Sequence, residues 1–138
     1  AVALGQLGAK RALVVHGSDG LDELTTTGPS RAALVDEGRV TCFEVDPRAL
    51  GLPLARSEDL AGGDAAHNAR ILRAVLAGER GPRRDIVLLN AAGALWAAGA
   101  VDDLAQGLVR AAESIDSGSA GDRLRALIEA TGAADRAD

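Results

Sequence analysis

The pattern of hydrophobic and polar positions predicts a short helix, one strand, a β-hairpin and then four helices. The first strand is a short apolar run, rich in β-branched valine, at residues 11–16. Residues 30–35 and 39–45 also have strand composition, and the segment 36–38 between them ends in glycine, so we expect a hairpin. Pro47 ends the second strand of this hairpin, because proline has no N–H to donate to a ladder.

Helical periodicity dominates the second half of the chain. The first of these helices has Asp64 as its predicted N-cap and ends at Gly78. The next begins near Pro82, since proline suits a first helical position. Its residues 85–98 are apolar on nearly every side, so we expect a helix that is buried all round, in which Asn90 needs a hydrogen-bonding partner. Two amphipathic helices follow at residues 101–115 and 122–130.

The order of elements indicates the α/β class, but the sequence predicts too few strands for a complete sheet. A single strand ahead of a hairpin makes an incomplete sheet, because such a strand normally joins parallel neighbours through βαβ units. The aromatic content of 1% leaves alanine, leucine and valine to fill the core, and small side chains each bury little area. The sequence also contains no methionine. We therefore expect the chain to be part of a longer protein that supplies the missing neighbours.

Bulk properties narrow the class of protein further. The length of 138 residues fits one domain, with 47% hydrophobic and 25% charged residues. The net charge of -5 argues against a nucleic-acid-binding surface, and no apolar run reaches the roughly 18 residues of a membrane span. The single cysteine, Cys42, has nothing to pair with, which favours a reducing compartment such as the cytoplasm. We expect neither a nucleic acid nor a membrane as a partner.

The candidate chemistry lies where the first strand ends. The strand stops at Gly17 and enters a loop that carries Asp19, Asp22 and Glu23. Ligands of open α/β sheets collect beyond the carboxyl ends of strands, and an acid pair there can hold Mg²⁺, which in turn holds phosphate. We interpret Asp19 as a residue that caps or orients this loop. From the residues alone, a solvated loop with incidental charge remains the alternative for Asp22 and Glu23.

Other polar and aromatic residues have simpler interpretations. We expect His16 to be hydrogen-bonded or partly buried, and Asn90 to be a buried polar bridge between helix and sheet. Trp96 is predicted to lie in the core, and residues 62–63 to help cap the following helix rather than bind an anion. The hydroxyl-rich residues 25–27 are predicted to be exposed extended chain.

Several motifs together resemble one enzyme family. Residues 14–23 (VVHGSDGLDE) resemble the Val-x-His/Gly-Gly-x-Asp-Gly-Leu-Asp-Glu signature of the anthranilate phosphoribosyltransferases. Further similar segments follow in the order of that family, and the similarity extends to about Leu127. These segments are residues 46–52, residues 60–65 with Asn68, residues 89–95 (LNAAGAL) and residues 111–118 (AAESIDSG).

The resemblance implies a fold and an activity. It implies that residues 1–138 are the C-terminal part of a nucleoside phosphorylase/phosphoribosyltransferase-like α/β domain, without the N-terminal helical and substrate-binding portion. The family transfers phosphoribosyl from phosphoribosyl pyrophosphate to anthranilate in tryptophan biosynthesis. Mg²⁺ holds the leaving pyrophosphate. By this resemblance Asp22 and Glu23 are metal ligands, and the full-length enzyme is a homodimer.

The family segments that contact phosphate and anthranilate do not occur in this sequence. The Gly-Thr-Gly-Gly-Asp, Asn-x-Ser and Lys-His-Gly-Asn segments lie upstream in the family, and residues 62–64 (GGD) lack the preceding Gly-Thr of the first. We therefore expect this chain to be inactive by itself. Two alternatives stay open: a relative of the pyrimidine-type nucleoside phosphorylases, and a non-catalytic structural remnant.

Overall fold

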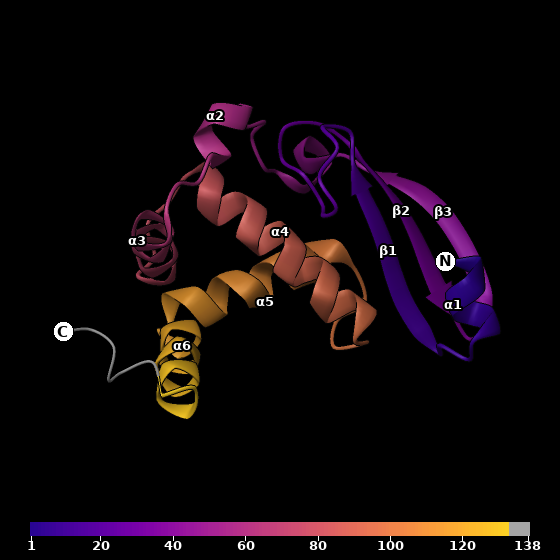
Figure 1. Ribbon diagram of the computed structural model, residues 1–138. Helices are drawn as coiled ribbons and strands as arrows, with labels where there is room; N and C mark the ends of the chain where they lie inside the picture. Colours follow the sequence, from indigo (N-terminus) through magenta and orange to yellow (C-terminus); the bar gives the residue numbers. More distant parts are fainter. Residues whose placement is uncertain (133–138) are drawn as a thin grey trace.

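A small sheet and a group of helices make up the computed structural model, which describes residues 1–132 (Figure 1). The α/β class is confirmed; the last six residues of the expected domain, 133–138, lie outside the described part. The elements are α1 (Val2–Gln6), β1 (Arg11–Gly17), β2 (Ser30–Asp36), β3 (Arg39–Val45), the 3₁₀ turn η1 (Pro47–Leu50), α2 (Ser57–Leu60), α3 (Ala65–Leu76), α4 (Pro82–Ala97), α5 (Leu104–Asp116) and α6 (Ser119–Ala130). No helix within residues 1–132 is both long and apolar enough to cross a membrane.

The sheet is three-stranded and antiparallel, in the order β1-β2-β3. The predicted hairpin is confirmed, because Glu37 and Gly38 both have positive φ (46° and 80°), the backbone of a tight two-residue turn. Within residues 1–132, β1 is an edge strand that pairs antiparallel with β2, so its expected parallel neighbours stay a prediction about the longer protein. The loop 18–29 reverses the chain direction and brings Gly17 opposite Ser30, so β1 pairs with the hairpin itself.

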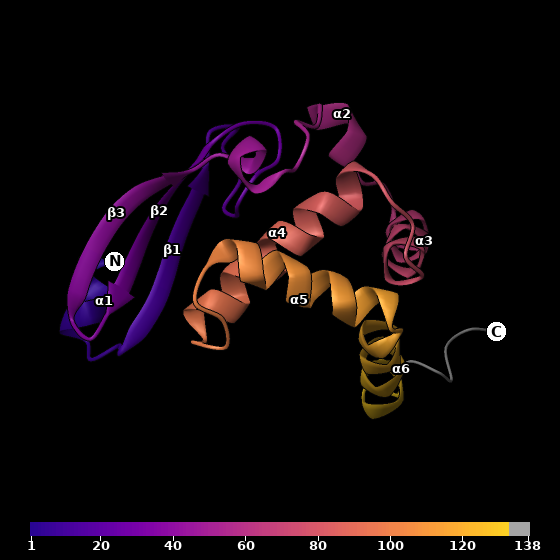
Figure 2. The ribbon, with the colours of Figure 1, turned by 180° about the vertical axis from the view of Figure 1, so that it is seen from behind.

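Helix α4 lies between the sheet and helix α3, as Figures 1 and 2 both show. One buried cluster joins the sheet to this helix, and a second joins the same helix to α3 and α5. The first contains Leu24, Ala32, Val45, Leu89, Ala92 and Leu104, with Trp96 packed against it as predicted; the second contains Val75, Leu88, Ala111 and Ile115. On the opposite face of the sheet α1 covers the hairpin, where Gly5 lies near Val35. The core is therefore split into two parts that share α4.

The prediction that α4 is buried all round is wrong. Leu88, Leu89 and Ala92 are buried, but Val87 is 41% exposed and Ala94 is exposed. The sheet, α3 and α5 cover only part of the helix circumference. An apolar strip of α4 therefore remains open beside the loop that follows β1.

Helices α4 and α5 make close backbone contact at Gly107. A Cβ atom at Gly107 would lie 2.8 Å from both Cα and Cβ of Ala92, which is shorter than any real Cβ contact. Near the end of this interface the buried Arg84 forms a 2.8 Å ion pair with Asp116. Glycine is thus required at position 107 for these two helices to pack.

We expect Gly107→Ala to destabilise the fold by about 1–3 kcal/mol, because the added methyl group overpacks the contact with Ala92. Gly121→Ala is a matched control in α6, where the nearest atom to a new Cβ is Arg125 Nη1 at 3.9 Å. There alanine should stabilise the helix by about 0.5–1 kcal/mol. Urea denaturation followed by circular dichroism measures both effects. A Gly107→Ala variant as stable as the parent would contradict the packing described here.

Candidate metal centre in an acidic loop beside an apolar cleft

The carboxylate of Asp19 organises the loop that follows β1. Its Oδ1 accepts a 3.1 Å hydrogen bond from the Leu21 amide, and its Oδ2 accepts bonds of 2.5 and 2.6 Å from the hydroxyls of Thr25 and Thr27. These three bonds join the start of the loop to its far side. The predicted role of Asp19 in orienting the loop is confirmed.

The same contacts keep Asp19 ionised. Partial burial acts to raise the pKa of Asp19, but the hydrogen bonds from Thr25, Thr27 and the Leu21 amide outweigh it. The pKa of Asp19 therefore lies below its ordinary value of 3.8. Ionised Asp19 is part of the folded structure at neutral pH.

The prediction that residues 25–27 are exposed extended chain is wrong. Thr25 and Thr26 are completely buried, and the Thr25 amide donates a 2.9 Å hydrogen bond to the Ser30 hydroxyl. The Thr25 hydroxyl bonds to Asp19, so its polar group is satisfied inside the loop. This internal partner accounts for the burial of Thr25, whereas the buried hydroxyl of Thr26 has no hydrogen-bond partner among the described residues.

Asn90 joins helix α4 to the loop. Its Oδ1 accepts a 2.9 Å bond from the Leu24 amide, and its Nδ2 donates a 2.8 Å bond to the Leu24 carbonyl and a 3.0 Å bond to the Ile86 carbonyl. The predicted polar bridge is confirmed in part: Asn90 bridges the helix to another segment, but it is half-buried and its partner is the loop rather than the sheet. Leu24 follows directly after the acid pair, so this bridge fixes the chain where the acids are carried.

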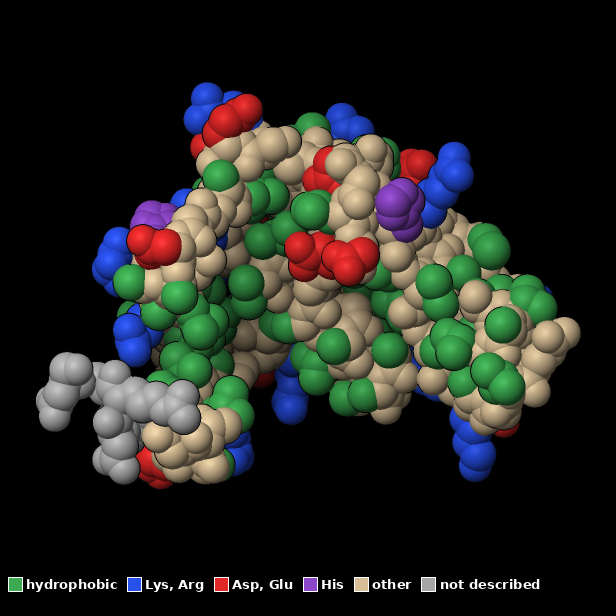
Figure 3. All heavy atoms as spheres, viewed as in Figure 1, with side chains coloured by type: hydrophobic (Ala, Val, Ile, Leu, Met, Phe, Trp, Pro, Cys, Tyr) green, Lys and Arg blue, Asp and Glu red, His purple; other side chains and the backbone are tan. Residues whose placement is uncertain are grey.

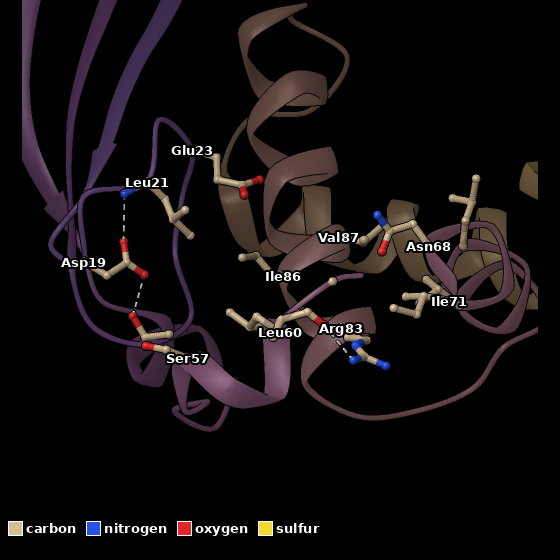
Figure 4. Close-up of a pocket in the computed structure, with 15 residues that line it drawn as sticks. Asp19, Leu21, Glu23, Ser57, Leu60, Asn68, Ile71, Arg83, Ile86 and Val87 are labelled. Atoms are coloured by element: carbon tan, nitrogen blue, oxygen red, sulfur yellow. Dashed lines mark hydrogen bonds between the residues drawn. The ribbon is translucent and has the colours of Figure 1, made fainter. Parts of the chain in front are cut away.

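The candidate ligands, Asp22 and Glu23, are both exposed. Glu23 lines a cleft between the loop and helices α3 and α4, and Figure 4 shows its carboxylate extending toward α4. Asp22 is not among the residues that line this cleft. Within residues 1–132 no third acidic, histidine or cysteine side chain completes a metal cluster. The pair could therefore hold a hard cation only with additional oxygen ligands from elsewhere, such as substrate phosphates and water.

The cleft beside the acid pair has a volume of about 580 Å³ and a largely apolar wall. Figure 3 shows hydrophobic side chains gathered around a hollow in this face, next to acidic ones. Arg83 is the basic residue of the lining, and its Nη2 donates a 2.9 Å hydrogen bond to the Ala61 carbonyl (Figure 4). The lining residues are Asp19, Leu21, Glu23, Thr27, Ser57, Leu60, Ala61, Gly62, Asn68, Ile71, Leu72, Val75, Arg83, Ile86 and Val87.

The remaining sequence candidates lie outside this centre or have structural roles. The prediction that His16 is hydrogen-bonded or partly buried is wrong: His16 is exposed on β1, because its side chain lies on the open face of the strand, and it does not line the cleft. Asp64 caps α3 by accepting a 2.7 Å bond from the His67 amide, and Asn68 bonds to both polar groups of Gly63. The capping bond of α3 thus comes from Asp64, as predicted, while the predicted capping role of residues 62–63 is not borne out, because Gly63 bonds to the Asn68 side chain instead. Arg83 and the apolar wall were not predicted from the sequence as parts of a site. The apolar residues on α3 and α4 could have indicated the wall.

Comparison with known proteins places this geometry in a family. The sequence matches the model of the "Glycosyl transferase family, a/b domain" over residues 1–121. The chain belongs to this glycosyl transferase family. Its relatives include the anthranilate phosphoribosyltransferase of Moorella thermoacetica, 56% identical over 93% of this chain and 38% of the relative, and that of Rhodospirillum rubrum, 56% identical over 96% and 38%. The chain spans about 38% of the length of these curated relatives.

Solved structures of the family have the same fold. The anthranilate phosphoribosyltransferase of Thermus thermophilus is similar with a TM-score of 0.82 and 39% identity, over 92% of this chain and 37% of that one. The enzyme from Saccharomyces cerevisiae, in complex with PRPP and Mg, has a TM-score of 0.79 and 28% identity, over 89% of this chain and 36% of that one. The expected resemblance to anthranilate phosphoribosyltransferases is thus confirmed.

Ionised Asp19 should stabilise the fold only above its folded-state pKa. That pKa is depressed, so the stabilisation is fully present above 3.8 and is lost as the pH falls through the lower folded-state value. We expect Asp19→Asn to lower the free energy of unfolding by about 1 kcal/mol at neutral pH, since the carboxylate is solvent-accessible. This difference should shrink between about pH 5 and about pH 2. Urea denaturation at each pH measures it, with the exposed Glu113→Gln as control. A pH-independent difference would contradict the assignment.

Proposed function

We propose that this chain forms the metal-binding wall of an anthranilate phosphoribosyltransferase, with Asp22 and Glu23 as the protein ligands of Mg²⁺. The observation that carries the proposal is the acid pair itself, exposed in an internally hydrogen-bonded loop beside a cleft. The names of the relatives support the activity, and the yeast structure in complex with PRPP and Mg supports the choice of metal. The substrates are accordingly phosphoribosyl pyrophosphate and anthranilate.

The donor set fits Mg²⁺ chemically. Two carboxylates offer hard oxygen ligands, and Mg²⁺ is normally held by one or two carboxylates together with substrate phosphates and water. When bound, the metal neutralises negative charge on the leaving pyrophosphate. Glu23 presents its carboxylate to the cleft, while Asn90 and Asp19 hold the loop on either side of the pair. Arg83 adds a positive charge to the lining that an anionic substrate would favour.

We further infer that this chain acts as the C-terminal part of the catalytic domain. The family segments that contact phosphate and anthranilate, named above, do not occur in its sequence, which supports inactivity of the chain alone. A homodimer of the complete enzyme is part of this proposal. So is a cytoplasmic location, which the lone, exposed Cys42 favours.

A chimera with the Moorella thermoacetica relative tests the proposal. The present chain would replace the 38% of that enzyme which it matches, since the two are 56% identical. We expect the chimera to transfer phosphoribosyl to anthranilate. Asp22→Asn and Glu23→Gln should each lower its kcat/KM by about 100-fold or more, because metal stabilisation of a leaving group contributes several kcal/mol.

Glu113→Gln is the matched control, since Glu113 is an exposed acid on α5, outside the cleft. It should change kcat/KM less than about two-fold, as expected for a surface substitution. An inactive but folded chimera would contradict the proposed activity. An active chimera in which both acid-pair variants keep full activity would contradict the metal assignment.

A further inference from the structure

We propose that Asn90 is a positioning residue for the acid pair, which it holds at the cleft by clamping both polar groups of Leu24. The inference rests on the proposed function and assigns a role in it to a helix residue distant in sequence. Asn90 bonds to the backbone of Leu24, the residue that follows Glu23. It therefore acts on the acid pair through the backbone and does not contact either carboxylate directly.

The chain is fixed immediately before the acid pair. The Leu21 amide donates a 3.1 Å bond to Asp19 Oδ1, and the Leu21 carbonyl accepts a 2.9 Å bond from the Gly17 amide. Both polar groups of this residue are therefore occupied within the loop. Gly17 is itself the last residue of β1, so this anchor belongs to the sheet.

The chain is fixed again immediately after the pair. The Leu24 amide and carbonyl both bond to the side chain of Asn90, at 2.9 and 2.8 Å. The Leu24 side chain is 1% exposed and lies so close to Gly93 that a Cβ there would be 3.1 Å from Leu24 Cδ1. This second anchor belongs to α4. Asp22 and Glu23 are thus the whole span between two anchored residues, one tied to the sheet and the other to the helix.

Asparagine is the side chain that this second anchor requires. Its amide carries one acceptor and two N–H donors, and here the acceptor and both donors are used, toward Leu24 and Ile86. An apolar side chain of similar size would leave the Leu24 amide and carbonyl without partners. Asparagine is also a poor residue for a helix interior, so its presence in α4 is explained by these bonds and not by helix formation.

Residues that orient metal ligands without touching the metal contribute measurably to metal affinity. Loss of such a partner typically weakens metal binding by about 10- to 100-fold. Because Asn90 fixes only one side of the pair, we expect Asn90→Leu to weaken binding by about 10-fold. The effect should appear in metal affinity and in the half-saturating Mg²⁺ concentration for turnover, more than in turnover at saturating Mg²⁺.

The test uses the chimera described above, with Mn²⁺ as the spectroscopic substitute for Mg²⁺. Free Mn²⁺ is measured by electron paramagnetic resonance in the presence of phosphoribosyl pyrophosphate, and the Mg²⁺ dependence of turnover is measured separately. Ile115→Ala is the control for a general loss of stability, since Ile115 is buried in the second cluster, away from the loop. If Asn90→Leu lacks a cooperative thermal transition, Asn90→Ser replaces it, because the smaller side chain leaves room for water beside the Leu24 backbone.

The outcomes separate the two proposals. Weaker Mn²⁺ binding by about 10-fold in the Asn90 variant, with Ile115→Ala unchanged, supports the positioning role. Unchanged binding in the Asn90 variant, while Asp22→Asn abolishes it, overturns the positioning role and leaves the proposed function intact. Equal weakening by Asn90 and Ile115 variants also overturns it, since stability alone would then be responsible. Unchanged binding in Asp22→Asn and Glu23→Gln overturns both.

Discussion

The paired hydrogen bonds between the Asn90 amide and the Leu24 backbone connect helix α4 to the loop that leaves the sheet after β1. The sheet contributes the strand from which the acidic loop emerges, and α4 contributes the side chain that holds the end of that loop. Without these bonds the amide and carbonyl of Leu24 would lose their partners at a buried position, which a folded protein rarely tolerates. The position of the acid pair therefore depends on the docking of α4 against the sheet.

The packing around α4 follows from the same constraint. One face of the helix is buried against the sheet through Leu89 and Ala92, and another is buried against α3 and α5 through Leu88. Gly107 lets α5 approach closely enough to keep the helix in place. The face that remains open carries Val87 and forms part of the cleft wall. A helix that looks uniformly apolar in sequence thus has two structural faces and one that borders the candidate site.

Elements with local signals could be predicted from the sequence, and features set by distant contacts could not. The strands, the hairpin turn at Gly38 and the cap at Asp64 depend on residues within a few positions of each other, and the structure has them. The burial of Thr25 and Thr26 depends on how the loop folds onto itself and onto the segment at Ala55, which no local pattern encodes. The resemblance identified Asp22 and Glu23, but only the structure distinguishes Glu23, which lines the cleft, from Asp22, which does not.

Paramagnetic broadening of amide signals by Mn²⁺ would test most directly whether Asp22 and Glu23 form the metal site of this chain. Even a weak site broadens its neighbours first when Mn²⁺ is substoichiometric, and the chimera with this chain isotopically labelled supplies the phosphate-contacting segments that the chain lacks. With phosphoribosyl pyrophosphate present, we expect the amide signals of Asp22, Glu23 and Leu24 to disappear before those of exposed acids elsewhere, such as Glu113. Broadening that begins at other carboxylates, or that affects all exposed acids equally, would contradict the account.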